Sequence, residues 1–130
     1  MVDFLTNRGI SMIFKIIWEF YVSAKSKDKC LKVVQKTITS LGIESDLQEC
    51  ERYWKDKSLF KVNLKSSLHA EDIQNAVFKV LGLSSIISRR WIVGSPQNYE
   101  NGKWEFAGWA SSRDLIFPGI SEASFRLTNF

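Results

Sequence analysis

Few of the residue types that build common catalytic sites occur in this sequence. It contains one histidine and two cysteines among 130 residues. Cys30 and Cys50 lack the spacing of metal ligands, and no serine or cysteine motif accompanies His69, as a nucleophile would require. A glycine-rich phosphate-binding loop of the Walker or dinucleotide type is also missing. We therefore expect a non-enzymatic protein without metal or cofactor, and we interpret His69 as a helix-capping or surface residue.

Membrane-spanning segments and targeting signals are missing as well. The main apolar stretch, residues 12–23, contains Lys15 and Glu19 and is too short to cross a bilayer. The first nine residues do not combine a basic region with an apolar one, as a signal peptide would. The two cysteines do not indicate a disulfide framework. These absences predict a cytoplasmic protein that does not contact a membrane.

The composition that remains is typical of one soluble domain with many aromatic residues. Hydrophobic residues make up 45% and charged residues 25% of the chain, which has five tryptophans and nine phenylalanines. The net charge of +4 is mildly basic and favours an anionic partner. We expect residues 12–130 to form a single domain, preceded by a flexible segment at residues 1–11.

The start of the chain has two interpretations. Arg8 and Gly9 can be encoded by a purine-rich string that resembles a ribosome-binding site, which would make Met12 the native first residue. The alternative is an ordinary flexible N-terminus that begins at Met1.

Residues 12–23 have the pattern of a central β-strand. Phe14, Ile16, Trp18 and Phe20 share one face, and the opposite face carries Ile13, Ile17 and Tyr21 beside two charged residues. Because both faces are largely apolar, we expect both to be covered. The C-terminal strands are the expected cover of the second face, and a partner protein is the alternative.

The elements that follow predict an α+β fold. We expect a helix from Ser26 to Gly42 and a second helix capped by His69 that ends at Gly82. The expected strands after the first are an edge segment at 43–54 and strands at 58–65, 86–93, 103–110 and 122–128. The first six elements have the order βαββαβ of the ferredoxin-like arrangement, an antiparallel sheet with two helices on one face. Its first and third strands are central, and the last two strands would be additions.

A row of lysines is the first candidate binding surface. Lys25, Lys29, Lys32 and Lys36 follow spacings of four, three and four, opposite the apolar stripe of the first predicted helix. A solvated helix face is the ordinary interpretation. However, the row contains no acidic residue, and it lies toward the helix N-terminus, where cations oppose the macrodipole. An acidic protein or a nucleic acid as partner would explain this pattern.

Acidic residues and loop aromatics supply further candidates. The acidic residues Glu44, Asp46, Glu49 and Glu51 lack the pattern of a calcium loop and are typical of a solvated edge that discourages strand addition. They are nevertheless an alternative partner-binding face. Tyr99, Trp109 and Phe117 lie in or near the two C-terminal loops. These aromatic residues would either contact a partner or complete the core.

RNA recognition through the sheet is disfavoured by the third strand. Residues 58–65 lack the aromatic motif with which RNA-recognition motifs stack bases, and Lys61, Asn63 and Lys65 point outward. Contacts between this strand and phosphate groups are still possible, whereas base stacking by the usual residues is not.

The last third of the chain resembles a known type of protein. The segments Trp91-Ile-Val-Gly-Ser-Pro, Trp104-Glu-Phe-Ala-Gly-Trp and Gly119-Ile-Ser-Glu-Ala-Ser-Phe-Arg-Leu are similar to those of small bacterial immunity proteins, which neutralise toxins delivered between neighbouring cells. The resemblance implies a compact α+β domain without catalytic residues. Many such proteins bind basic nuclease toxins through acidic surfaces. For this basic chain it therefore implies either a local acidic face at Glu44 to Glu51 or a toxin that is not a cationic nuclease.

These observations predict a non-enzymatic protein-binding domain, with toxin immunity by surface occlusion as the named possibility. The alternative is a nucleic-acid-binding or regulatory module that uses the lysine row from Lys25 to Lys36.

Overall fold

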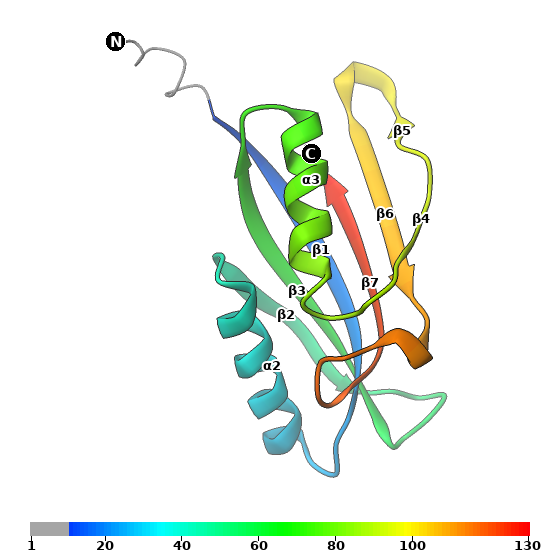
Figure 1. Ribbon diagram of the computed structural model, residues 1–130. Coiled ribbons are helices and arrows are strands. Elements are labelled where there is room, and N and C mark those ends of the chain that lie inside the picture. The colour runs from blue at the N-terminus through cyan, green and yellow to red at the C-terminus, as the bar shows by residue number, and fades with distance from the viewer. Residues whose placement is uncertain (1–10) are drawn as a thin grey trace.

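The computed structural model describes residues 11–130, which form two helices and a seven-stranded antiparallel sheet (Figure 1). The predicted α+β class is therefore confirmed. The flexible segment predicted at residues 1–11 lies outside the described residues, apart from Ser11, and so does the choice between Met1 and Met12 as the native start. None of the helices within residues 11–130 combines the length and apolar character that crossing a bilayer requires.

Strand β1 (Met12–Ser23) occupies the centre of the sheet. It pairs along its whole length with β3 (Leu59–Ala70) and, on its other side, with β7 (Ile120–Thr128). One face of β1 is fully buried, because its side chains point toward the helices; these are Phe14, Ile16, Trp18, Phe20 and Val22. The predicted central position of this strand and its pairing with the third strand are confirmed.

The remaining strands extend the sheet to both sides. The strand order is β2-β3-β1-β7-β6-β4, and β5 also pairs with β6. The bounds are Ser45–Arg52 for β2, Ile92–Val93 for β4, Gln97–Asn98 for β5 and Trp104–Ala110 for β6. Two short 3-10 turns, η1 (Glu100–Gly102) and η2 (Ser112–Asp114), flank β6.

The strand predicted at residues 86–93 is wrong for most of its length. Only Ile92–Val93 is a strand, and it pairs with β6 at the sheet edge. The preceding residues form a loop because Ile87 is fully buried and its carbonyl accepts hydrogen bonds from the backbone of Ile116 and Phe117. Since most of this segment is not a strand, the position next to β1 is occupied by β7. There Phe125 packs edge-on against Trp18, with ring centroids 6.0 Å apart.

Both helices begin at polar capping residues. Helix α2 (Lys27–Leu41) is capped by Ser26 and ends at Gly42, which has the left-handed φ of 68°, as predicted. Helix α3 (Ile73–Ser84) is capped by Asp72, whose carboxylate accepts a hydrogen bond from the Asn75 backbone. The prediction of His69 as the cap was wrong because β3 continues through it to Ala70. Gly82 does not end α3, which continues to Ser84.

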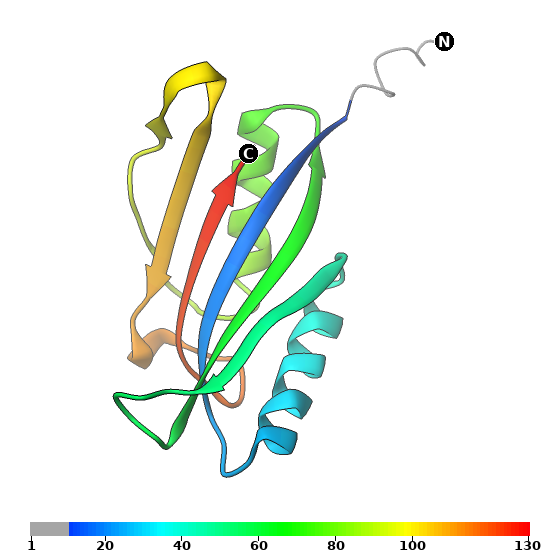
Figure 2. The same ribbon diagram turned by 180° about the vertical axis from the view of Figure 1, so that it is seen from behind.

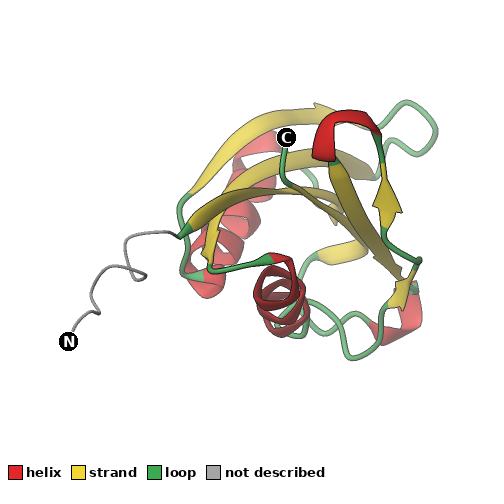
Figure 3. Cartoon of the chain, turned by 90° about the horizontal axis from the view of Figure 1, so that it is seen from above, coloured by secondary structure: helices red, strands yellow, loops and turns green. Residues whose placement is uncertain are grey.

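Within residues 11–130, no element covers the second face of the sheet, contrary to prediction. Figure 3 shows both helices on one side of the curved sheet, and Figure 2 shows the strands from behind with no element across them. Ile13 on this face is 62% exposed, while Ile17 and Tyr21 are half-buried. Strands β6 and β7 do not cover this face, because each has an apolar side of its own that must be buried. They extend the sheet and direct their own apolar side chains toward the helices.

Candidate functional site

The lysine row lies on the outer side of α2. Lys25, Lys29, Lys32 and Lys36 are all exposed, and no carboxylate within residues 11–130 forms an ion pair with them. The helix carries Asp28 in its first turn and no basic residue in its last turn. Lys25 and Lys29 therefore lie at the end of the helix where the macrodipole is also positive, and Lys32 and Lys36 continue the row along the next turns.

Phe117 joins this row through the loop that precedes β7. A hollow of about 520 Å³ is lined by residues of α2 and of this loop, namely Lys32, Gln35, Lys36, Thr39, Ser40 and Phe117. The loop is pressed against the helix at Gly119, where an added Cβ would lie 2.9 Å from a Val33 methyl group. The Gly119 carbonyl also accepts a hydrogen bond of 2.9 Å from the Ser23 backbone. An aromatic ring is thus held beside two lysines.

Arg52 adds a fixed cation at the other end of α2. It lines a second hollow, of about 540 Å³, together with Lys25 and Lys29. Its guanidinium donates hydrogen bonds to the carbonyls of Lys57 (2.8 Å), Lys25 (3.2 Å) and Ala24 (3.4 Å), and it lies 4.2 Å from the centroid of the Phe60 ring. Arg52 was missed because its partners lie in loops distant in the sequence.

These residues make up one surface, which we call the α2 basic surface. It consists of Lys25, Lys29, Lys32, Lys36, Arg52 and Phe117. Four of the seven candidate binding residues from the main sequence prediction are its lysines, and Phe117 is a fifth. The other two aromatic candidates lie elsewhere.

The acidic candidates do not form a comparable surface. Asp46, Glu49 and Glu51 of β2 lie on the uncovered sheet face, in register with Lys65, Asn63 and Lys61 respectively. Asn63 donates a hydrogen bond of 2.8 Å to the Glu49 carboxylate. Glu44 lies in the turn that joins α2 to β2, across a groove from α3. Lysines of β3 thus lie opposite two of these carboxylates in the strand register, and no metal-binding group of three or more such residues is found within residues 11–130.

Trp109 and Tyr99 lie far from α2 and from each other. Trp109 is 53% exposed on the uncovered sheet face, where it borders a hollow of about 410 Å³ with Ile17 and Arg126. Tyr99 lies beyond β5, edge-on to Phe130 with ring centroids 6.2 Å apart. Each aromatic residue thus belongs to a separate part of the surface.

A further aromatic cluster lies where the β2–β3 hairpin turns. Tyr21 and Tyr53 approach to 4.8 Å between ring centroids, and Trp54 beside them is 77% exposed. Burial and the nearby Glu19 carboxylate raise the pKa of Tyr21 to about 12, so this phenol is neutral at physiological pH. Sequence reasoning placed Trp54 in an edge strand and did not single it out.

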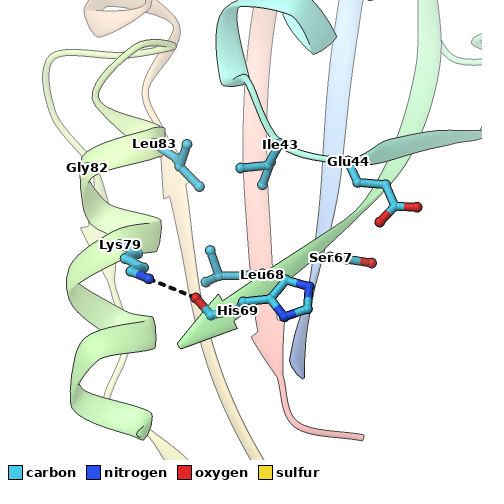
Figure 4. A pocket seen from close by; sticks show the side chains of 8 residues that line it. All are labelled: Ile43, Glu44, Ser67, Leu68, His69, Lys79, Gly82 and Leu83. Carbon is cyan, nitrogen blue, oxygen red and sulfur yellow. Dashed lines mark hydrogen bonds between the residues drawn. The ribbon is translucent and has the colours of Figure 1, made fainter. Parts of the chain in front are cut away.

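A groove of about 600 Å³ separates α3 from the turn that joins α2 to β2 (Figure 4). Ile43, Leu68 and Leu83 form its apolar part. The polar residues around it are Glu44, Ser67, His69 and Lys79. Lys79 Nζ donates a hydrogen bond of 2.8 Å to the His69 carbonyl. Within residues 11–130 the His69 ring has no hydrogen-bond partner, so no Cys–His or Ser–His pair is formed there.

The two cysteines meet beneath α2. Cys30 Sγ and Cys50 Sγ lie 3.6 Å apart, and both side chains are buried. Burial and the hydrogen bond with Cys50 raise the pKa of the Cys30 thiol to about 12. This thiol is therefore a poor nucleophile and a poor metal ligand at neutral pH.

The geometry thus presents one uncompensated basic surface, one mixed-charge sheet face and one apolar groove. Comparisons of the chain with protein-family models, with curated proteins and with solved structures found no match.

Proposed function

We propose that this protein is a non-enzymatic protein-binding domain whose α2 basic surface contacts an acidic region of its partner. The observation that carries the proposal is that the α2 lysines have no carboxylate ion-pair partner within residues 11–130, while two of them, Lys32 and Lys36, line a hollow together with Phe117. Like charges three or four residues apart each cost about 0.2–0.5 kcal/mol in a helix. Cations near its N-terminus cost about 0.3–1 kcal/mol more. An acidic partner would offset both costs.

A protein suits this surface better than a nucleic acid. A nucleic acid follows a continuous basic track, whereas Lys61 and Lys65, two of the remaining cations, lie on the opposite sheet face in register with Glu51 and Asp46. The α2 basic surface instead combines charge with Phe117 and the aliphatic parts of lysine side chains. Aromatic residues surrounded by polar groups are typical of protein interfaces.

Toxin immunity is the kind of protein binding that we propose. The resemblance of the C-terminal third to immunity proteins supports it, as does the absence of a paired nucleophile in the described part of the chain. Since the basic surface is the uncompensated one, the toxin would present an acidic region. The protein would act in the cytoplasm by covering that region.

We also infer that the core is a variant of the ferredoxin-like fold. The order β2-β3-β1-β7, with both helices on one face, supports this inference. In this variant the last strand of the chain occupies the fourth position, next to β1.

The alternative function is a nucleic-acid-binding or regulatory module, because the same lysines could contact phosphates. The two functions differ in salt dependence. Phosphate contacts weaken steeply as salt rises, whereas an interface with a large apolar component weakens less.

The experiment is a binding and protection assay with the product of the gene directly upstream. The double substitution Lys32→Gln/Lys36→Gln should weaken binding by about tenfold or more and abolish growth protection, because two interfacial charges are lost. The matched control, Lys61→Gln/Lys65→Gln, removes two lysines from the opposite face and should leave affinity unchanged. Equal losses in both variants, or purification with nucleic acid alone, would contradict the proposal.

A further inference from the structure

Within residues 11–130, no strand pairs with the end of β3 on the side that opens into the groove beside α3. The pairing of β2 with β3 ends at Ser45 and Ser66, whereas β3 continues to Ala70. The Ser67 N–H donates to the Glu44 carbonyl at 3.0 Å, on the side of β2. Because backbone groups alternate along a strand, the N–H and carbonyl of His69 point to that same side, where β2 is no longer present.

A lysine side chain, and not a strand, occupies this edge. Lys79 Nζ reaches from α3 to the His69 carbonyl at 2.8 Å (Figure 4). A flexible ammonium group is a replaceable partner for a carbonyl. An incoming backbone N–H could take its place, and the ammonium would then need an anion.

The walls of the groove are suited to an aliphatic side chain. Ile43, Leu68 and Leu83 supply the apolar surface. Gly82 lines the same groove, and a Cβ added there would have no heavy atom within 4 Å. Packing therefore does not require a glycine at this position of α3, where glycine costs backbone entropy. The missing side chain leaves that wall of the groove open.

The two sides of the groove carry opposite charges. Lys79 is the one lysine or arginine that lines it within residues 11–130, and Glu44 lies on the other side (Figure 4). A ligand carboxylate would be attracted to Lys79 and repelled by Glu44. Combined with an unpaired strand edge and an aliphatic hollow, this arrangement matches the end of an extended peptide chain.

We propose that this groove binds the C-terminal end of an extended peptide whose last side chain is aliphatic. The terminal carboxylate pairs with Lys79, which leaves the His69 carbonyl, and the peptide backbone pairs with the N–H and the carbonyl of His69. The aliphatic side chain lies on Ile43, Leu68 and Leu83. This site is separate from the α2 basic surface, so the proposal stands whether or not that surface binds a toxin.

The test uses N-acetylated five-residue peptides of alternating threonine and valine that end in leucine, as the free acid and as the amide. Each is titrated into the full-length, isotope-labelled protein and followed by backbone NMR. We expect shifts at residues 43–44, 67–70 and 79–83, with the acid binding about tenfold more tightly than the amide because of the charge-assisted contact. Lys79→Met should remove that difference and keep binding of the amide.

Two further changes separate strand pairing from simple burial of an apolar group. N-methylation of the peptide's last amide should weaken binding, because that N–H would donate to the His69 carbonyl. Gly82→Leu should fill the groove and abolish binding, while Gly82→Ala keeps it; thermal unfolding of both variants verifies that they are folded.

Several outcomes would overturn the proposal. These are no binding of any peptide at millimolar concentration, shifts confined to α2 or to the uncovered sheet face, and equal affinity of acid and amide. If 4-methylpentanoate alone bound as tightly as the peptide, the site would be one for small carboxylates and the peptide proposal would be wrong.

Discussion

Lysines lie on both sides of the sheet, but their neighbours differ. On the uncovered face, Lys61 forms an ion pair of 3.4 Å with Glu19 and also lies opposite Glu51 in the strand register. On the helical side, the lysines of α2 have no ion-pair partner within residues 11–130. On the uncovered face this lysine therefore lies beside carboxylates, whereas the α2 lysines have no such partner within residues 11–130. The proposed recognition of an acidic partner would accordingly depend on the arrangement of the lysines more than on the net charge of +4.

The two faces of β1 provide the prediction with the largest effect. Phe20→Ala should lower the free energy of unfolding by about 3–5 kcal/mol, because a fully buried ring leaves a cavity. Ile13→Ala on the uncovered face should cost less than about 1 kcal/mol, since Ile13 is 62% exposed. Urea denaturation measures both. Similar costs would mean that the second face is covered in solution.

Two glycines should respond to alanine with opposite signs. A Cβ at Gly108 would lie 2.9 Å from Phe125 Cε2 and 3.0 Å from Val93 Cγ1, so Gly108→Ala should destabilise by about 1–3 kcal/mol. Gly82→Ala adds a Cβ in open space within α3 and should stabilise by about 0.5–1 kcal/mol. Thermal or urea unfolding would show the contrast. A stabilising Gly108→Ala would contradict the close packing of β6 on β7.

Charge reversal should separate stability from binding on α2. Lys29→Glu places a carboxylate three residues after the cap Ser26, which completes a capping box and suits the macrodipole. We expect a gain of about 0.5–1 kcal/mol in stability together with weaker partner binding.

The matched reversal on the uncovered face is Lys61→Glu. It removes the ion pair with Glu19 and places like charges side by side, so it should cost about 0.2–1 kcal/mol. Reversed signs for these two substitutions would refute the contrast between compensated and uncompensated charge.

The prediction with the smallest effect near neutral pH concerns the stability of the fold at alkaline pH. The pKa values of Cys30 and Tyr21 are both raised to about 12, from ordinary values of about 8.5 and 10. The unfolded chain therefore releases these protons at lower pH than the folded protein. The contribution of these two groups to stability should be constant below about pH 8 and should decline from there to about pH 12.

Tyr21→Phe separates the two contributions to that decline. It should reduce the loss of stability above about pH 10 and leave the part between about pH 8.5 and 10, which belongs to Cys30. Urea unfolding at several pH values measures this. A free energy of unfolding that does not change up to pH 11 would contradict the burial of both groups.

The sequence correctly predicted the elements that are strongly amphipathic or that are bounded by local capping residues. The alternation in residues 12–23 identified β1, and the cap at Ser26 and Gly42 bounded α2. The prediction for residues 86–93 was wrong because a buried loop and a strand have the same apolar pattern. The loop is distinguished by the hydrogen bonds that Ile87 accepts from the segment before β7. These hydrogen bonds join residues distant in the sequence.

The candidate site was also predicted only in part, because some of its residues come together through contacts that are distant in the sequence. The spacing of the lysines along α2 is visible in the sequence. The adjacency of Phe117 and Arg52 to them is not, since it arises from loops that pack on the helix from two different strands. The uncovered sheet face was also unforeseen, because half-buried residues such as Ile17 and Tyr21 resemble core residues in a pattern of residue types.

Hydrogen exchange on the complex with the product of the upstream gene tests the central claim most directly. The account predicts that complex formation slows amide exchange in residues 25–40 and 113–119, which form and border the α2 basic surface, while residues 45–51 of β2 and all of β6 are unchanged. Protection confined to the strands of the uncovered face, with α2 exchanging as in the free protein, would contradict it.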